Sequence, residues 1–126
     1  MVISLLFRCS PQAARFLLLD PKGVELTAYR GVPHLAHPVI TYEIQSVAAL
    51  TWAAQEADRR RRLFGSTRVR ELSQFNQVSP DPLPRLVLVI DDLAPIWARQ
   101  RAVSHTRVLN ISVRRSRLVN RIEPRC

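Results

Sequence analysis

The segment that most constrains the fold is residues 85–90, an aliphatic run without polar alternation that ends in two acids, Asp91 and Asp92. Such a run is typical of a strand that is buried on both faces of a parallel sheet. A second run of this kind covers residues 15–20, and Pro21 stops it. Because a long helical stretch separates the two runs, the sequence predicts an α/β fold with a parallel sheet.

Breakers and apolar periodicity predict the remaining elements. The predicted segments are a helix over residues 2–7, a short helical turn within 24–30, a loop over 31–38, a long helix over 43–64 that Thr41 caps and Gly65 ends, a shorter helix over 69–75, and a proline-rich linker over 79–84.

Four charged residues follow the two predicted strands. Ligand sites in parallel sheets lie at the carboxyl ends of strands, where Asp20, Lys22, Asp91 and Asp92 all fall. A buried strand ending in two acids suits a nucleotide hydrolase, in which the first carboxylate sits beside Mg²⁺ and the second orients the attacking water. The alternative is structural, because acids at a strand end often cap the next helix.

The net charge of +9 is unevenly distributed along the chain. Residues 98–126 hold eight arginines and one acid, whereas residues 1–97 carry a net charge of only +2. We therefore expect one domain over residues 1–97 and a separate arginine-rich tail over 98–126, with 108–113 as its nearest candidate for an edge strand. The tail could bind a polyanion without any specific site, lie on acidic lipid or be disordered, and the sequence does not separate these alternatives.

Several conspicuous residues have structural interpretations. Arg59–Arg62 is predicted as a solvated helix end near the helix dipole, with phosphate contacts as the alternative. His34 and His37 lack further ligands at suitable spacing, so no metal site is predicted there. Trp52 is expected in the core. No run approaches the roughly 18 apolar residues that span a bilayer, which predicts a cytoplasmic location.

A resemblance sharpens these expectations. Blocks in order over roughly residues 1–96 resemble the FtsK/SpoIIIE family of double-stranded DNA translocases. They are Asp-Pro-Lys and Glu-Leu within 16–29, Gly-Val-Pro-His-Leu at 31–35, residues 38–41 and 49–52, Glu56 with Arg59 and Arg60, Phe75 with Asn76, and the strand and acids of 86–94.

The resemblance implies a RecA-like P-loop NTPase domain that hydrolyses ATP with Mg²⁺. It implies a ring homo-oligomer around double-stranded DNA, acting in chromosome segregation or conjugative transfer, and intact members are often anchored by an upstream membrane segment. Asp91 would be the Mg²⁺-side carboxylate and Asp92 the catalytic acid. Asp20 and Lys22 would lie near the nucleotide.

Three departures from the family pattern predict a partial motor domain. The phosphate-binding pattern G-x-x-x-x-G-K-[ST] is absent, because none of the three glycines of the chain stands in it. Asp92 stands where the family has glutamate, and no buried strand with a polar sensor residue is found after Trp97. We expect an N-terminally truncated motor that binds ATP weakly and is inactive alone. The alternative is a non-catalytic basic protein that docks on an intact motor or binds DNA through its tail.

Overall fold

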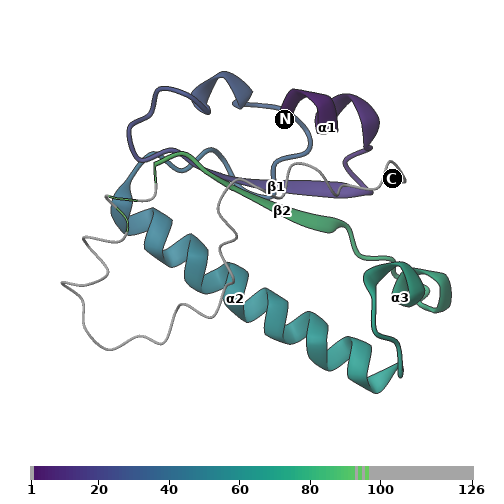
Figure 1. Cartoon of the computed structure of the whole chain (residues 1–126). Coiled ribbons are helices and arrows are strands. Elements are labelled where there is room, and N and C mark those ends of the chain that lie inside the picture. The colour runs from purple at the N-terminus through teal and green to yellow at the C-terminus, as the bar shows by residue number, and fades with distance from the viewer. Residues whose placement is uncertain (1, 93, 95, 97–126) are drawn as a thin grey trace.

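The computed structural model describes residues 2–92, 94 and 96, and it confirms the α/β class. The predicted tail over residues 98–126, including its candidate strand, lies outside the described residues. In chain order the elements are α1 (Val2–Arg8), β1 (Ala14–Leu19), the short 3₁₀ helix η1 (Thr27–Tyr29), α2 (Glu43–Ser66), α3 (Leu72–Val78) and β2 (Arg85–Ile90) (Figure 1).

The sheet confirms the predicted parallel pairing. β1 and β2 run side by side in register from Ala14 opposite Arg85 to Leu19 opposite Ile90. On the other edge of β1, bridges to Leu35 and Ile40 extend the ladder. β1 is therefore the middle of three backbone segments, which explains why it is almost entirely buried. β2 has one strand partner among the described residues, and its aliphatic side chains are only half-buried.

The two faces of β1 pack against different helices. Because successive side chains of a strand point to opposite faces, Phe16 and Leu18 join a cluster with Val2 of α1, whereas Leu17 and Leu19 join a cluster with residues of α2. Figure 1 shows α1 and α2 on opposite sides of the strands. Coverage on both faces is the physical reason for the unbroken apolar run.

The end of α2 departs from the prediction. The helix continues through Gly65 to Ser66, and its left-handed terminal position belongs to Arg68, with φ of 56°. The N–H groups of Arg68 and Val69 donate to the carbonyls of Gly65 and Phe64 at 3.2 and 3.0 Å, which is the Schellman arrangement. A left-handed non-glycine residue costs about 1–2 kcal/mol, so the sequence offers no sign of this ending.

Other boundaries and one core assignment also differ. Tyr42, not Thr41, precedes α2, and it makes no capping hydrogen bond through its side chain. The shorter helix begins at Leu72, after Glu71, instead of at residue 69. The prediction that Trp52 is a core residue is wrong, because Trp52 is 46% exposed and lines an open apolar groove of about 460 Å³ beside Ile40.

Candidate functional site

The parallel register brings the acidic ends of the two strands to one edge of the sheet. Leu19 pairs with Ile90, so Asp20 and Asp91 leave the sheet side by side. The N–H of Asp91 donates to the carbonyl of Leu19 at 2.9 Å, which fixes the backbone at this point. The structure thus places the predicted residues of both strands at the same edge.

Asp20 is committed to the loop that follows β1. Its side chain is buried, and its two carboxylate oxygens accept the N–H groups of Gly23 and Leu26, each at 2.8 Å. Burial alone would raise the pKa of Asp20, but backbone N–H donors, with Leu26 the strongest, outweigh it and hold the pKa below its ordinary value. Gly23 adopts φ of 69°, which suits this tight turn. Asp20 therefore shapes the loop that carries Lys22.

Lys22 and Asp92 form an ion pair across the two strand ends. The Nζ of Lys22 lies 2.7 Å from Oδ2 of Asp92, and the two side chains are 62% and 29% exposed. This hydrogen bond raises the pKa of Lys22 and lowers the pKa of Asp92. Oδ1 of Asp92 accepts the N–H of Ala94 at 3.1 Å. Asp92 thus accepts a hydrogen bond from the backbone that follows it, as predicted for an acid that caps the next segment. It also forms an ion pair with Lys22.

Asp91 differs from the other two acids. Its side chain is half-buried, and it makes no hydrogen bond or ion pair within residues 2–92, 94 and 96. Asp92, next to it, adopts φ of 56°, a left-handed conformation that aspartate tolerates better than most residues. Asp91 is therefore the carboxylate left available to a ligand at this edge.

Comparison with known proteins decides the family. The FtsK/SpoIIIE family matches residues 1–122. The chain belongs to the FtsK/SpoIIIE family. The resemblance in the sequence is thereby confirmed, and the α/β fold is that of part of a P-loop domain of this family. The match extends beyond residue 97, and the predicted boundary there stays a prediction.

Curated relatives of the family are DNA translocases. The chain is 42% identical over 100 residues to DNA translocase SftA of Bacillus subtilis, covering 75% of this chain and 10% of SftA. It is 39% identical over 101 residues to DNA translocase FtsK of Clostridium acetobutylicum, covering 76% and 13%. It is 33% identical over 135 residues to DNA translocase FtsK 1 of Neisseria meningitidis, covering 89% and 17%. The chain thus spans less than a fifth of the length of these relatives.

The Glu56 motif, one of the blocks on which the family resemblance was based, is structural in this fold. Glu56 accepts hydrogen bonds from Nε and Nη2 of Arg59 at 2.7 and 2.8 Å and from Nε of Arg60 at 2.7 Å. Arg60 also donates to the carbonyl of Pro84 at 2.6 Å. This carboxylate therefore ties the middle of α2 to the chain that enters β2.

The contribution of Glu56 to the stability of the fold should depend on pH. The hydrogen bond from Arg59, helped by Arg60 and opposed by burial, lowers the pKa of Glu56 from 4.5 to about 2. A lowered folded-state pKa stabilises the fold above pH 4.5, and this contribution is lost as the pH falls toward 2. We expect Glu56→Gln to lower the midpoint of urea unfolding at pH 7. Below pH 4.5 the midpoint of this variant should fall less steeply with decreasing pH than the midpoint of the unchanged protein.

The same substitution at the exposed Glu25 serves as the matched control. It should leave both the midpoint at pH 7 and the acid limb unchanged. Equal behaviour of the two variants would show that the Glu56 hydrogen bonds contribute nothing to the fold.

The histidines are not gathered with the acids. The ring of buried His34 donates from Nε2 to the carbonyl of Cys9 at 2.7 Å and meets Phe16 edge-on at 6.1 Å. The exposed His37 is hydrogen-bonded to the carbonyl of Pro38. Within the part of the chain that the structure describes, no three His, Cys, Asp or Glu side chains form a metal-holding group, and no helix is long and apolar enough to cross a bilayer.

The sequence predicts that these residues lie at the carboxyl edge of the sheet, but it does not predict which of them contact each other. Lys22 and Asp92 are 70 positions apart, and nothing in the pattern pairs them. The signal that could have suggested the pair is the shared strand-end position of a lone lysine and two acids, because opposite charges at one sheet edge attract.

Proposed function

We propose that the chain is part of the motor domain of an ATP-driven translocase of double-stranded DNA, in which it supplies the acidic strand end that faces the Mg²⁺-nucleotide. The observation that carries the proposal is the meeting of Asp91, Asp92 and Lys22 at the carboxyl edge of a parallel sheet in a member of this family. In the intact protein this domain works within a ring of identical subunits around DNA, in chromosome segregation or conjugative transfer.

The residues at the edge fit a magnesium-bound nucleotide in part. Mg²⁺ takes oxygen ligands, commonly one or two carboxylates together with the phosphates, and it neutralises charge on the transferred phosphoryl group. Asp91, whose side chain makes no hydrogen bond or ion pair among the described residues, is the Mg²⁺-side ligand. Asp92 is the acid that orients water, and Lys22 holds it in place by the 2.7 Å ion pair.

Asp20 has a different part in the proposal. Because both of its oxygens already accept backbone N–H groups, it acts by positioning Lys22 and not by touching the nucleotide. The sequence offers no G-x-x-x-x-G-K-[ST] loop whose backbone amides could cradle the phosphates. We therefore propose that the isolated chain captures ATP weakly and that the phosphate cradle comes from elsewhere in a complete motor.

Manganese provides the test, because Mn²⁺ takes the same oxygen ligands and broadens the NMR signals of nearby nuclei. Titration of the full chain should first broaden the amide signals of Asp20, Lys22, Gly23, Asp91 and Asp92. Asp91→Asn should weaken this binding at least tenfold, roughly the 1.4 kcal/mol that a lost carboxylate ligand would cost at minimum.

Asp81→Asn is the control, since Asp81 is an exposed aspartate that lies outside this edge. It should leave the broadening at residues 91–92 unchanged. Manganese binding that is indifferent to Asp91, or that centres on Asp81, would refute the assignment of Asp91.

A further inference from the structure

A second charged surface lies at the end of α2, and only part of the arginine run Arg59–Arg62 contributes to it. Arg59 and Arg60 are held by Glu56, and Arg61 pairs with Asp58 at 2.8 Å. These three guanidiniums are therefore engaged by two carboxylates within the helix, which leaves a net charge of +1. The prediction that the run is a solvated helix end holds for Arg59, Arg61 and Arg62, which are exposed, but not for Arg60, whose side chain is only 16% exposed and reaches the Pro84 carbonyl.

Four arginines around this end have no such partner. They are exposed, and within the described residues their side chains make no hydrogen bond or ion pair: Arg62, Arg68, Arg70 and Arg85. Two exposed acids, Glu71 and Asp81, belong to the same segment. Residues 56–85 contain seven arginines and four acids, a net charge of +3, so the surface stays positive after its internal pairs are counted.

The elements that carry these arginines form one packed unit. Phe64 of α2 and Phe75 of α3 pack against each other, with ring centroids 5.3 Å apart and ring planes tilted by 43°. The side chain of Asn76 is hydrogen-bonded to both backbone groups of Leu83, at 2.9 and 2.8 Å. The hydrogen bond from Arg60 to the Pro84 carbonyl joins α2 to the same segment. The backbones that present the four free arginines are therefore fixed relative to one another before any partner binds.

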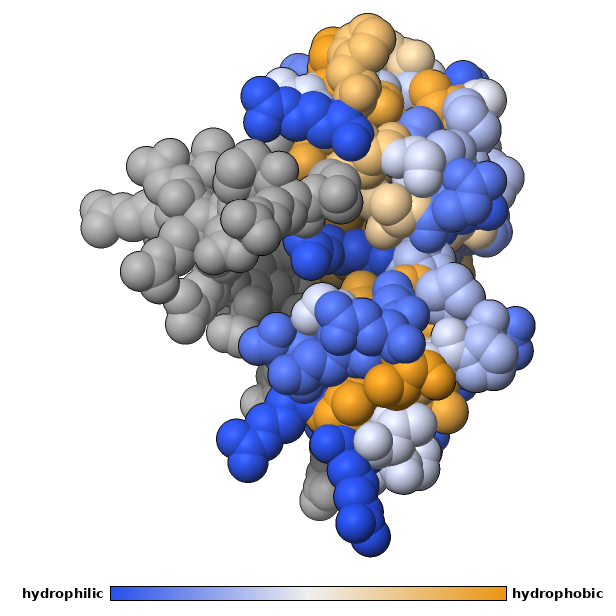
Figure 2. All heavy atoms as spheres, turned by 90° about the vertical axis from the view of Figure 1, so that its right-hand side faces the viewer, coloured by the Kyte–Doolittle hydropathy of each residue, from blue (hydrophilic) through white to orange (hydrophobic). Residues whose placement is uncertain are grey.

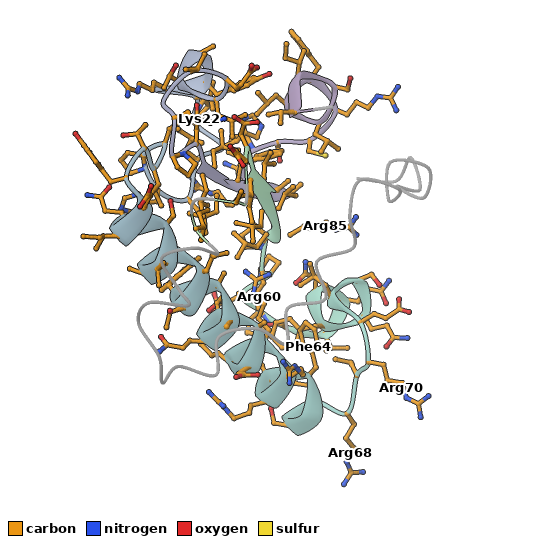
Figure 3. The ribbon with its side chains drawn as sticks, turned by 60° about the vertical axis from the view of Figure 1, so that its left-hand side comes forward. Lys22, Arg60, Phe64, Arg68, Arg70 and Arg85 are labelled. Carbon is orange, nitrogen blue, oxygen red and sulfur yellow. The ribbon has the colours of Figure 1, made fainter. Side chains whose placement is uncertain are left out.

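Arg68 occupies a backbone position that favours glycine. Its φ of 56° is the left-handed end of the Schellman motif, where a side chain adds strain. Strained residues gather at functional sites more often than elsewhere. Figure 3 shows Arg68 and Arg70 pointing away from the body of the molecule, on the side opposite to Lys22. The arginine surface is thus remote from the acidic strand end.

The chemistry of this surface selects a phosphate backbone. A guanidinium offers a planar fork of donors that matches phosphate oxygens. At the α3 end of the molecule, Figure 2 shows strongly hydrophilic side chains around an apolar patch. The two phenylalanines there pack on each other, with Phe75 buried, and so offer no platform for stacking unpaired bases. A duplex, which presents phosphates and hides base faces, fits better than a single strand.

We propose that Arg68, Arg70 and Arg85 form a binding surface for the phosphate backbone of double-stranded DNA, at the end of the fold opposite the nucleotide edge. The choice of DNA as the polyanion rests on the proposed function. A duplex bound here would contact the segment between α2 and α3 and the start of β2 together. It would leave Lys22, Asp91 and Asp92 uncovered.

Salt dependence provides the test. Each phosphate contact contributes a slope of about −0.9 to log K against log salt, so Arg68→Gln with Arg70→Gln should reduce the slope for a random-sequence duplex by about two. The full chain is used without nucleotide, and the arginine-rich tail contributes equally to every variant. The matched control is Arg8→Gln with Arg30→Gln, two exposed arginines that also lack partners in the described residues. Their removal should leave the slope unchanged.

The variant Arg68→Gly distinguishes an effect on DNA binding from an effect on the stability of the fold. Glycine relieves the left-handed strain, so this variant should unfold at higher urea concentration while its slope falls by about one. The proposal is overturned if the two double variants change the slope equally, or if a single strand of the same length binds more tightly than the duplex. Neither result depends on Asp91, so failure here leaves the manganese test of the nucleotide edge standing, and the reverse also holds.

Discussion

Phe16→Ala is expected to destabilise the fold by about 3–5 kcal/mol, since it removes a fully buried aromatic side chain from the centre of the sheet. Phe16 lies on β1, packs against Val2 and Leu18, and meets the ring of His34. Its backbone donates to the His34 carbonyl and accepts from Ala36. The cavity left by the ring would open between β1 and α1, where few neighbours can collapse into it. Urea unfolding followed by circular dichroism measures the change through the midpoint at constant slope.

Phe7→Ala is the matched control. Phe7 is 88% exposed, so the identical substitution should change the free energy of unfolding by less than about 0.5 kcal/mol. The comparison isolates burial from residue type, because both variants lose the same atoms from aromatic side chains near α1. Similar losses at both positions would mean that β1 is not the centre of the core.

The sequence was sufficient to predict the strands because each is a short apolar run that a breaker or an acid ends. Residues 85–90 match β2 at both ends, and β1 differs from its prediction by one residue at each end. Because β1 lacks alternating polar residues, both of its faces are expected to be covered by other elements. Strands that are buried on both faces occur mainly in parallel sheets, so parallel pairing is expected as well. The common edge of Asp20 and Asp91 is then a geometric consequence of parallel strands in register.

The helix ends and the contacts between elements could not be predicted in the same way. Glycine is a residue type that often ends helices, yet α2 continues through Gly65 and the Schellman hydrogen bonds form around Arg68 instead. Trp52 lies on the sheet side of α2 by periodicity but lines an open groove. Such outcomes depend on how elements meet in space, which propensity and spacing do not encode.

The two charged ends of the fold are separated by the length of the sheet and differ in how their charges are satisfied. At the carboxyl edge Lys22 pairs with Asp92 and leaves Asp91 without an ion pair, whereas at the other end Glu56 and Asp58 pair with three arginines and leave Arg68, Arg70 and Arg85 without a partner among the described residues. In each case the residue without an internal partner is the one assigned to a ligand. A charged side chain that already has an ion-pair partner within the fold is less available to a ligand than one without a partner. This difference, and not the net charge of the region, therefore distinguishes the residues proposed to bind a ligand.

The short acid at position 92 leads to the largest expected effect on rate. In an intact family member with glutamate at this position, replacement by aspartate should slow ATP hydrolysis by about 100-fold, because withdrawing the carboxylate by one methylene misplaces it by on the order of 1 Å. Nucleotide binding should be nearly unchanged, since the role that we propose for this acid is to orient water and not to bind the phosphates. Single-turnover hydrolysis and equilibrium nucleotide binding measure the two quantities separately.

Glutamine at the same position serves as the reference for complete loss of the acid, and it should be slower still. If the aspartate variant kept more than a tenth of the normal rate, the reach of this side chain would not limit hydrolysis, and Asp92 would be as competent as glutamate. If the aspartate and glutamine variants were equally slow, a carboxylate at the length of Asp92 would contribute nothing to catalysis. The 2.7 Å ion pair with Lys22 would then be the main role of Asp92, as a structural contact between the two strand ends.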